Sequence, residues 1–573
     1  MGLVRGPALR QDAGLRRRPR GDRDPAAGRT GGRDSSARPG RRRRHPATGP
    51  AGRALGGLRP GPAGARAHRG LARRTAPRTA PRRRRPLGRP DRPHELDRLQ
   101  RGRSPPDHRH RNSRRLAHRD GGRHDERGDV RVTAAVPPFA GAGNLIYRAE
   151  HVPRFVRAEG SYLQAADGRR YLDAEAANGT VAWGYDRQIL RDALTYCQDL
   201  PALPSFCESE LRLEVLQRLE RLFGEAVGAP GRVELDLGGA QGMETALRIA
   251  FSAVGPGTVV VFEGAFHGRS GVTSMLSSSP RYRELLAAWG LEVVRLPSPD
   301  CGRCPHAAAQ ATACGKGCIA AATRWGSELS GVGGKGFSRK VSAFVFESVQ
   351  NVGGMAEPDH ALLRAAVDHA RANGAVVIAD EIFTGMHRTG PRWGFQRSGV
   401  SPDVVVTSKA LTNGAAALSA VWAREPLAAP RTYRPGSHSS TYIGIPHALG
   451  VTRAVLDRWD AWAEPAADME RLAGALTSRL RRLQAAHPDL VRDCQAFGGA
   501  ARLVLTGDHA PALRRLCLTA DPRTGLVVAS TGMAPDVINI HPPLVIDDQD
   551  LDVMADVLDQ ALTLLRESPE GRS

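Results

Sequence analysis

Between residues 232 and 408, short apolar runs alternate with amphipathic segments, and this alternation limits the possible folds more than any other feature. The runs are rich in valine, and the segments between them repeat apolar residues every three or four positions. Strands that are apolar on both faces belong to a mostly parallel sheet with helices on both sides. The pattern therefore predicts an α/β fold. Strands are expected at 233–237, 258–264, 291–296, 342–348, 375–380 and 403–408, and helices at 243–254, 280–290 and 360–374.

The flanking sequence predicts further elements. Residues 160–173 are typical of a β-hairpin whose turn is Asp167-Gly168, because such pairs accept positive φ. Apolar periodicity predicts helices at 187–200, 208–226, 447–459, 464–485 and 549–566, and a weaker strand at 501–506. We expect a tail (1–131), an N-terminal segment with the hairpin (132–200), a large domain (201–436) and a smaller α+β domain (437–573).

All of the excess positive charge lies in the tail. The chain carries a net charge of +23, whereas residues 1–130 alone hold 37 arginines against 12 acidic residues. The tail has no Lys, Phe, Tyr, Trp, Cys or Ile, so it cannot bury enough apolar surface to fold. Three interpretations stay open: a spurious upstream extension of the reading frame, a disordered linker, or a nucleic-acid-binding arm. The absence of aromatic residues for base stacking disfavours the last.

The sequence shows no export signal and no apolar run of about 18 residues, so we expect a cytoplasmic protein without a membrane span. A glycine-rich insertion at 300–338 interrupts the large domain. Metal binding, disulfides and free thiols all stay open for its cysteines, and no metal ligand is assigned. They are Cys301, Cys304, Cys314 and Cys318.

Lys409 is one of only four lysines among 82 basic residues, and it directly follows an expected strand. Arginine stays protonated in proteins, whereas a buried lysine can lose its proton and form a Schiff base. Asp380 ends another apolar strand, and carboxyl ends of parallel strands meet at one sheet edge. The pair suggests a pyridoxal 5′-phosphate (PLP) site, in which Lys409 binds the aldehyde and Asp380 the pyridine nitrogen.

The remaining parts of the cofactor also have candidates. Gly238-Gly239-Ala240 lies between a strand and a helix, where backbone N–H groups can bind a phosphate. Phe266 could stack on the ring. Each feature alone has an ordinary alternative: a common βα turn, a core aromatic, an N-cap for Asp380, or a surface lysine. The combination is more specific than any part.

Longer stretches resemble the class III aminotransferases of the aspartate aminotransferase superfamily (fold type I) over roughly residues 145–570. AVVIADEIFTGMHRTG is similar to the family's DE-x-x-TG-x-x-RTG signature, and GVSPDVVVTSKALTNG to its lysine segment. VFEGAFHGR, SHSSTYIGIPHAL and VINIHPPLVI match further family segments. The resemblance implies a PLP-dependent aminotransferase with a large, mostly parallel α/β domain and a smaller α+β domain. It also implies a homodimer with shared active sites.

The resemblance assigns roles to individual residues. It implies that Lys409 is the catalytic Schiff-base lysine and that Asp380 is both catalytic and cofactor-binding. The other implied contacts are Phe266 and Ile382 on the two ring faces, Gly239 and Ala240 on the phosphate, Thr441 on the phosphate of the neighbouring subunit, and Gln350 and Glu347 near the substrate.

Departures from the family pattern concern the substrate. Several members bind the glutamate carboxylate through an arginine three residues before the Pro-Pro pair, where this chain has Asn539. An amide cannot make the bidentate contact of an arginine, and Arg388 or Arg502 could substitute. We expect small-molecule amine and carbonyl substrates, with a peptide-linked substrate as one alternative. A racemase, aminomutase or decarboxylase of the same fold is the alternative within enzymes.

Overall fold

The computed structural model describes residues 153–568, apart from 205, 285, 287–289 and 299–339. All of them belong to one unit of the chain, residues 128–573. The arginine-rich tail 1–131 and the insertion 300–338 with its four cysteines lie outside the described residues. Within the described ranges, no helix combines the length and apolar character needed to cross a bilayer.

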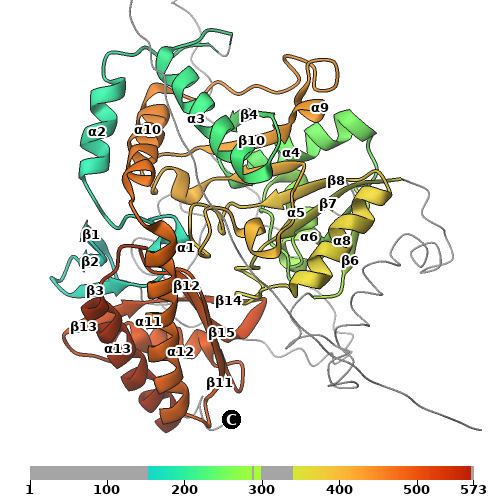
Figure 1. The fold of residues 1–573 in the computed structure, drawn as a ribbon. Coiled ribbons are helices and arrows are strands. Elements are labelled where there is room, and N and C mark those ends of the chain that lie inside the picture. The colour runs from blue at the N-terminus through green and yellow to red at the C-terminus, as the bar shows by residue number, and fades with distance from the viewer. Residues whose placement is uncertain (1–152, 205, 285, 287–289, 299–339, 569–573) are drawn as a thin grey trace, which may run out of the picture. The chain divides into compact units, whose positions relative to one another are not determined.

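A seven-stranded sheet forms the centre of the larger part (Figure 1). Its parallel strands pair in the order β9-β8-β7-β5-β6. The mostly parallel sheet is thus confirmed, and β10, which pairs antiparallel with β9 and with the edge strand β4, was not predicted. The strands are β4 (Gly231–Asp236), β10 (Ser419–Arg424), β9 (Val404–Thr407), β8 (Val376–Asp380), β7 (Val341–Glu347), β5 (Thr258–Phe262) and β6 (Val293–Leu296).

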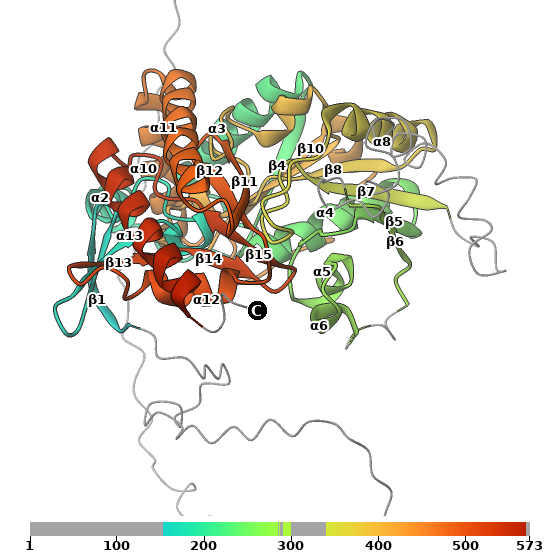
Figure 2. The same cartoon turned by 90° about the horizontal axis from the view of Figure 1, so that it is seen from below.

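Helices cover both faces of this sheet, because its strands are apolar on both sides. Helix α4 (Gly239–Val254) packs with Val259 and Val261 in one cluster, whereas α3 (Glu210–Val227) and α8 (His360–Ala372) share the other cluster with the intervening Val260 and Phe262. Alternate residues of one strand therefore lie in two cores. Figure 2 shows the same arrangement from below. Smaller elements here are α5 (Gly271–Leu276), α6 (Pro280–Arg283), η4 (Gly394–Ser398), η5 (Lys409–Leu411) and α9 (Glu425–Ala428).

Helix α4 begins at Gly239, four residues before the expected start, because Gly238 is its N-cap and Met243 lies in its second turn. The expected helix at 280–290 is described only as α6, and part of its remainder lies outside the described residues. The other expected helices are confirmed within two residues at their N-termini and three at their C-termini. They are α2 (Gln188–Cys197), α3, α8, α10 (Pro446–Ala461), α11 (Pro465–Ala486) and α13 (Asp548–Glu567).

Two further sheets lie outside the large one. An antiparallel sheet in the order β11-β12-β15-β14 packs against α11 and α12 (Ala510–Cys517). Its strands are β11 (Val491–Phe497), β12 (Ala500–Leu505), β15 (Ala534–Ile540) and β14 (Ala529–Thr531). The expected hairpin is confirmed as β2 (Tyr162–Ala165) and β3 (Arg170–Asp173), with β1 (Phe155–Glu159) beside β2 and β13 (Thr524–Val527) parallel to β3.

Candidate active site

The carboxyl ends of β7 and β8 bring two acidic residues together. The parallel register places Glu347 directly opposite Asp380, and both are buried. Asp380 Oδ1 accepts a hydrogen bond from Ile382 N at 3.1 Å, and Oδ2 lies 2.8 Å from His267 Nδ1. Glu347 Oε1 accepts from Phe266 N at 2.8 Å. Five sequence-predicted or neighbouring residues thus form one connected group.

His267 is the partner of Asp380 that sequence reasoning did not assign. Burial lowers the pKa of this imidazole, but the hydrogen bond and charge of Asp380 outweigh burial and raise it above the usual value. Its Nε2 atom is buried without a partner. A signal was available, because His267 directly follows Phe266, but a lone buried histidine is commonly structural.

Lys409 lies just after β9 with a left-handed backbone, φ 47°. Non-glycine residues rarely adopt this conformation, and it is concentrated at functional sites. Its Nζ atom lies 5.1 Å from the centre of the Phe383 ring. Burial lowers the pKa of the Lys409 ammonium, and the charges of Asp380, Glu347 and Glu175 act in the opposite direction. The lowered pKa favours the neutral amine, which is the nucleophilic and basic form.

The loop after Lys409 is tied to the N-terminal segment by Asn413. Its side-chain oxygen accepts from Trp183 N at 2.8 Å, and its amide nitrogen donates to Gly184 O at 3.0 Å. Asn413 itself has φ 47°. Two strained positions four residues apart are therefore held by contacts with a distant part of the chain.

The glycine turn before α4 has the features of an anion site. A Cβ atom on Gly239 would lie 2.9 Å from Ile382 Cδ1, so a larger residue would require the Ile382 side chain to shift. The first N–H groups of the 16-residue helix have no acceptor within the helix, and its dipole favours an anion. Each part of PLP has a matching group here. The glycine turn suits the phosphate and Ile382 the ring. Asp380, held by His267, suits the pyridine nitrogen, and Lys409 suits the aldehyde. The residues therefore fit this cofactor.

Thr441 is not brought into this group. It is exposed in the loop between α9 and α10, and none of the described contacts joins it to Lys409, Asp380 or Gly239. The resemblance implies that it contacts the phosphate of a neighbouring subunit.

Arg388 and Arg502 were the candidates to replace a carboxylate-binding arginine. Arg388 is fully buried and donates to three main-chain oxygens: those of Gly499 (2.9 Å), Pro542 (2.5 Å) and Gly179 (3.3 Å). Burial lowers the pKa of Arg388 to about 9. Its terminal nitrogens thus join three segments, which argues against a bidentate contact with a substrate.

Arg502 lies across from Asn539 in the β12–β15 register. One of its terminal nitrogens is 3.9 Å from Asp493 Oδ2. Asn539 donates to the main-chain oxygen of Asn351 at 2.7 Å, so the two asparagines lie together beside Arg502.

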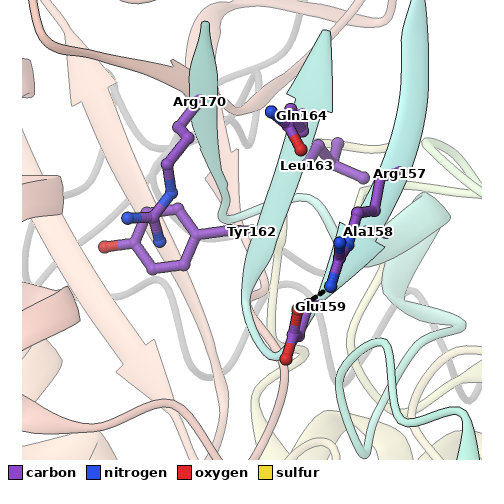
Figure 3. A pocket seen from close by; sticks show the side chains of 7 residues that line it. All are labelled: Arg157, Ala158, Glu159, Tyr162, Leu163, Gln164 and Arg170. Carbon is purple, nitrogen blue, oxygen red and sulfur yellow. Dashed lines mark hydrogen bonds and ion pairs between the residues drawn. The ribbon is translucent and has the colours of Figure 1, made fainter. Parts of the chain in front are cut away.

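A surface pocket on the N-terminal strands is separate from this group of residues (Figure 3). It is lined by residues of β1–β3, where Arg170 stacks 4.0 Å from the Tyr162 ring centre and Arg157 pairs with Glu159 at 2.8 Å. None of the groups that act on Lys409 lines it.

Fold and site together define a PLP-dependent transferase of fold type I. Residues 147–562 match the family model of the class-III aminotransferases. The chain is 30% identical to the 4-aminobutyrate aminotransferase of Mycobacterium bovis over 423 residues, which cover 71% of this chain and 90% of that protein. It is 29% identical to the acetylornithine aminotransferase of Streptomyces clavuligerus, covering 72% and 92%.

Solved structures agree on the fold. An amine transaminase from an uncultivated Pseudomonas species, in its PLP-bound form, has a TM-score of 0.64 at 22% identity, covering 74% of this chain and 97% of that one. A Bacillus anthracis aminotransferase has a TM-score of 0.63 at 21% identity, covering 74% and 96%. The chain belongs to the class-III aminotransferase family and is a PLP-dependent aminotransferase.

Proposed function

We propose that Lys409 is the residue that binds the cofactor covalently and then carries the substrate proton. The observation that carries this proposal is the position of its amine, with a lowered pKa, among Asp380, Glu347 and Glu175 at the carboxyl edge of the sheet. A neutral amine can attack an aldehyde and later accept a proton from the substrate carbon. PLP, when bound, supplies an electron sink for the charge that develops on that carbon.

The other residues hold and orient the cofactor. Asp380 would accept from the pyridine nitrogen, and His267 orients its carboxylate through the 2.8 Å contact. Gly239 and Ala240 would donate backbone N–H groups to the phosphate, and Phe266 and Ile382 would confine the ring. Thr441 would complete the phosphate site of a second subunit, which requires a homodimer. We place this enzyme in the cytoplasm.

The reaction moves an amino group from a small amine donor to a carbonyl acceptor in two half-reactions. The relatives named for 4-aminobutyrate and acetylornithine support amine donors of this size. We propose a donor other than the usual glutamate, because Asn539 contacts Asn351 and cannot replace a guanidinium. A peptide-linked amine is included in this class.

The test is Lys409→Ala in the holoenzyme. We expect loss of the absorbance of the lysine-linked cofactor and a fall in turnover of roughly 10⁴-fold or more, as for loss of a covalent nucleophile. Arg substitution at Lys340, the other lysine among the described residues, is the control and should change neither. Transamination at the wild-type rate in Lys409→Ala would falsify the assignment.

A further inference from the structure

A strained turn lies beside Lys409 and is not explained by cofactor binding. The four residues of α1 (Ala176–Gly179) all have left-handed backbones, with φ of 47°, 51°, 61° and 75°. For Ala176 and Ala177 this conformation costs about 1–2 kcal/mol per residue, whereas asparagine and glycine adopt it more readily. Asp173 holds the turn by accepting from Glu175 N at 3.0 Å and Ala176 N at 2.9 Å.

This turn packs against the same ring as Lys409. A Cβ atom on Gly179 would lie 2.7 Å from Phe383 Cε2, and Lys409 Nζ lies over the Phe383 ring. Glu175 directly precedes the turn as its N-cap, its side chain makes no capping hydrogen bond, and its charge acts on Lys409. The turn therefore places a carboxyl group beside the reacting amine.

Of the three acids that act on Lys409, Glu175 is the most accessible. Asp380 is 4% exposed and Glu347 is 7% exposed, whereas Glu175 is partly exposed. Asp380 faces His267, and Glu347 accepts from Phe266 N. Glu175 is therefore the acid of the three with the largest open surface.

The cation near Lys409 is unsuited to a substrate carboxylate. Arg388 is the guanidinium that acts on Lys409, and its terminal nitrogens donate to main-chain oxygens. A carboxylate beside Lys409 would instead meet the acid Glu175. The local charges favour a substrate with a donor or a positive charge at this place.

Asn539 carries a second buried acceptor. Asn539 is 1% exposed, and its amide orientation is fixed because Nδ2 donates to the Asn351 main-chain oxygen. Its Oδ1 atom is buried without a hydrogen-bond partner. His541, two positions further along the chain, has its ring centre 5.4 Å from that of Phe383. A buried acceptor without a donor costs free energy until a donor arrives.

We propose that Glu175 determines substrate specificity: it accepts a hydrogen bond from a second amino or amide N–H group close to the reacting carbon. The enzyme accordingly prefers amines with such a donor to amines with a carboxylate at that place. This inference rests on the proposed role of Lys409. Burial raises the pKa of Glu175 to about 7, and a bound ammonium group stabilises the charged carboxylate.

The test compares three donors that share CH3–CH(NH2)–: 1,2-diaminopropane, sec-butylamine and alanine. The rate of the first half-reaction is measured for each with the holoenzyme. Because charge-assisted hydrogen bonds are the stronger ones, we expect wild type to favour 1,2-diaminopropane over sec-butylamine by about tenfold or more, and alanine to react most slowly. Glu175→Gln keeps the size of the side chain but loses the charge, so the diamine preference should fall to about threefold or less.

Glu159→Gln is the matched control, because Glu159 lies in the same N-terminal segment, exposed and paired with Arg157. It should retain the wild-type preference. An equal loss of rate for all donors in Glu175→Gln would mean a structural role only and would overturn the proposal, as would a wild-type preference for alanine. If no amine changes the cofactor absorbance of wild type, the proposed function itself fails.

A binding measurement covers the case in which these donors turn over too slowly to rank. Neither 1-dimethylamino-2-propanol nor its apolar analogue 4-methyl-2-pentanol can form a Schiff base. Titration of the cofactor absorbance should give tighter binding of the amino alcohol to wild type and equal binding of both to Glu175→Gln. Equal binding of both to wild type contradicts the proposal.

Discussion

Two neighbouring acids at the end of β8 behave in opposite ways. Glu381 is fully buried and accepts four hydrogen bonds, from Ser348 Oγ, Thr384 Oγ1, Gly394 N and Phe395 N at 2.7–2.8 Å. Asp380 has His267 and the Ile382 N–H, and Lys409 acts on it by charge alone. The saturated acid fixes the loop, whereas the less saturated one keeps acceptor capacity for a ligand. Proximity to the site therefore does not distinguish the two acids. The number of hydrogen bonds that each carboxylate already accepts distinguishes them.

The largest expected effect concerns the less saturated acid. Asp380→Asn keeps the size of the side chain and removes the charge that the pyridine nitrogen requires. We expect the rate to fall by about 10²–10³-fold, as for loss of a single electrostatic contact in an active site. Single-turnover kinetics with an amine donor measure this. A rate within twofold of wild type would erase the distinction between the two acids.

For the saturated acid the effect should be on folding. Glu381→Gln replaces one oxygen by an amide group that faces N–H and O–H donors, so the free energy of unfolding should drop by roughly 1–3 kcal/mol. Urea unfolding measures the drop. The protein that remains folded should transaminate at close to the wild-type rate, and a selective loss of rate with unchanged stability would contradict this.

A buried imidazole near Lys409, that of His541, makes the stability of the protein depend on pH. Burial, followed by the charges of Arg388 and Lys409, lowers the pKa of His541 to about 3. Below the ordinary value of about 6.5 the unfolded chain takes up a proton that the folded chain does not, so stability falls as the pH falls. Between pH 7 and pH 5 the loss should be about 2 kcal/mol. Measuring the unfolding free energy of His541→Gln and of wild type at both pH values isolates the contribution of His541. The same change with pH in both proteins would refute the expectation.

The smallest effect comes from one of the four donors. Ser348→Ala removes the hydrogen bond to Glu381 Oε1, and Phe395 N still donates to the same oxygen. We expect a loss of about 1 kcal/mol in unfolding free energy and no change in the half-reaction rate. Thermal shift and stopped-flow absorbance measure the two quantities. A loss as large as that of Glu381→Gln would mean that the three remaining donors do not stabilise the Glu381 carboxylate without Ser348.

The sequence was sufficient for the parallel strands and most helices, because apolar periodicity is a local property. It did not predict β10, whose antiparallel pairing with β4 and β9 depends on topology. Among the site residues, strand ends indicated Asp380 and Lys409. The contact between His267 and Asp380 joins positions 113 residues apart. The left-handed turn after Glu175 contains three non-glycine residues that local propensity does not place there.

The parallel pairing of β3 with β13 has a consequence for biosynthesis. Arg170 aligns with Thr524, so the N-terminal sheet cannot close until β13 has left the ribosome. Contacts of such long sequence separation form late and slow folding. During translation β3 keeps an open edge until β13 emerges, and an open strand edge is a template for pairing with other chains.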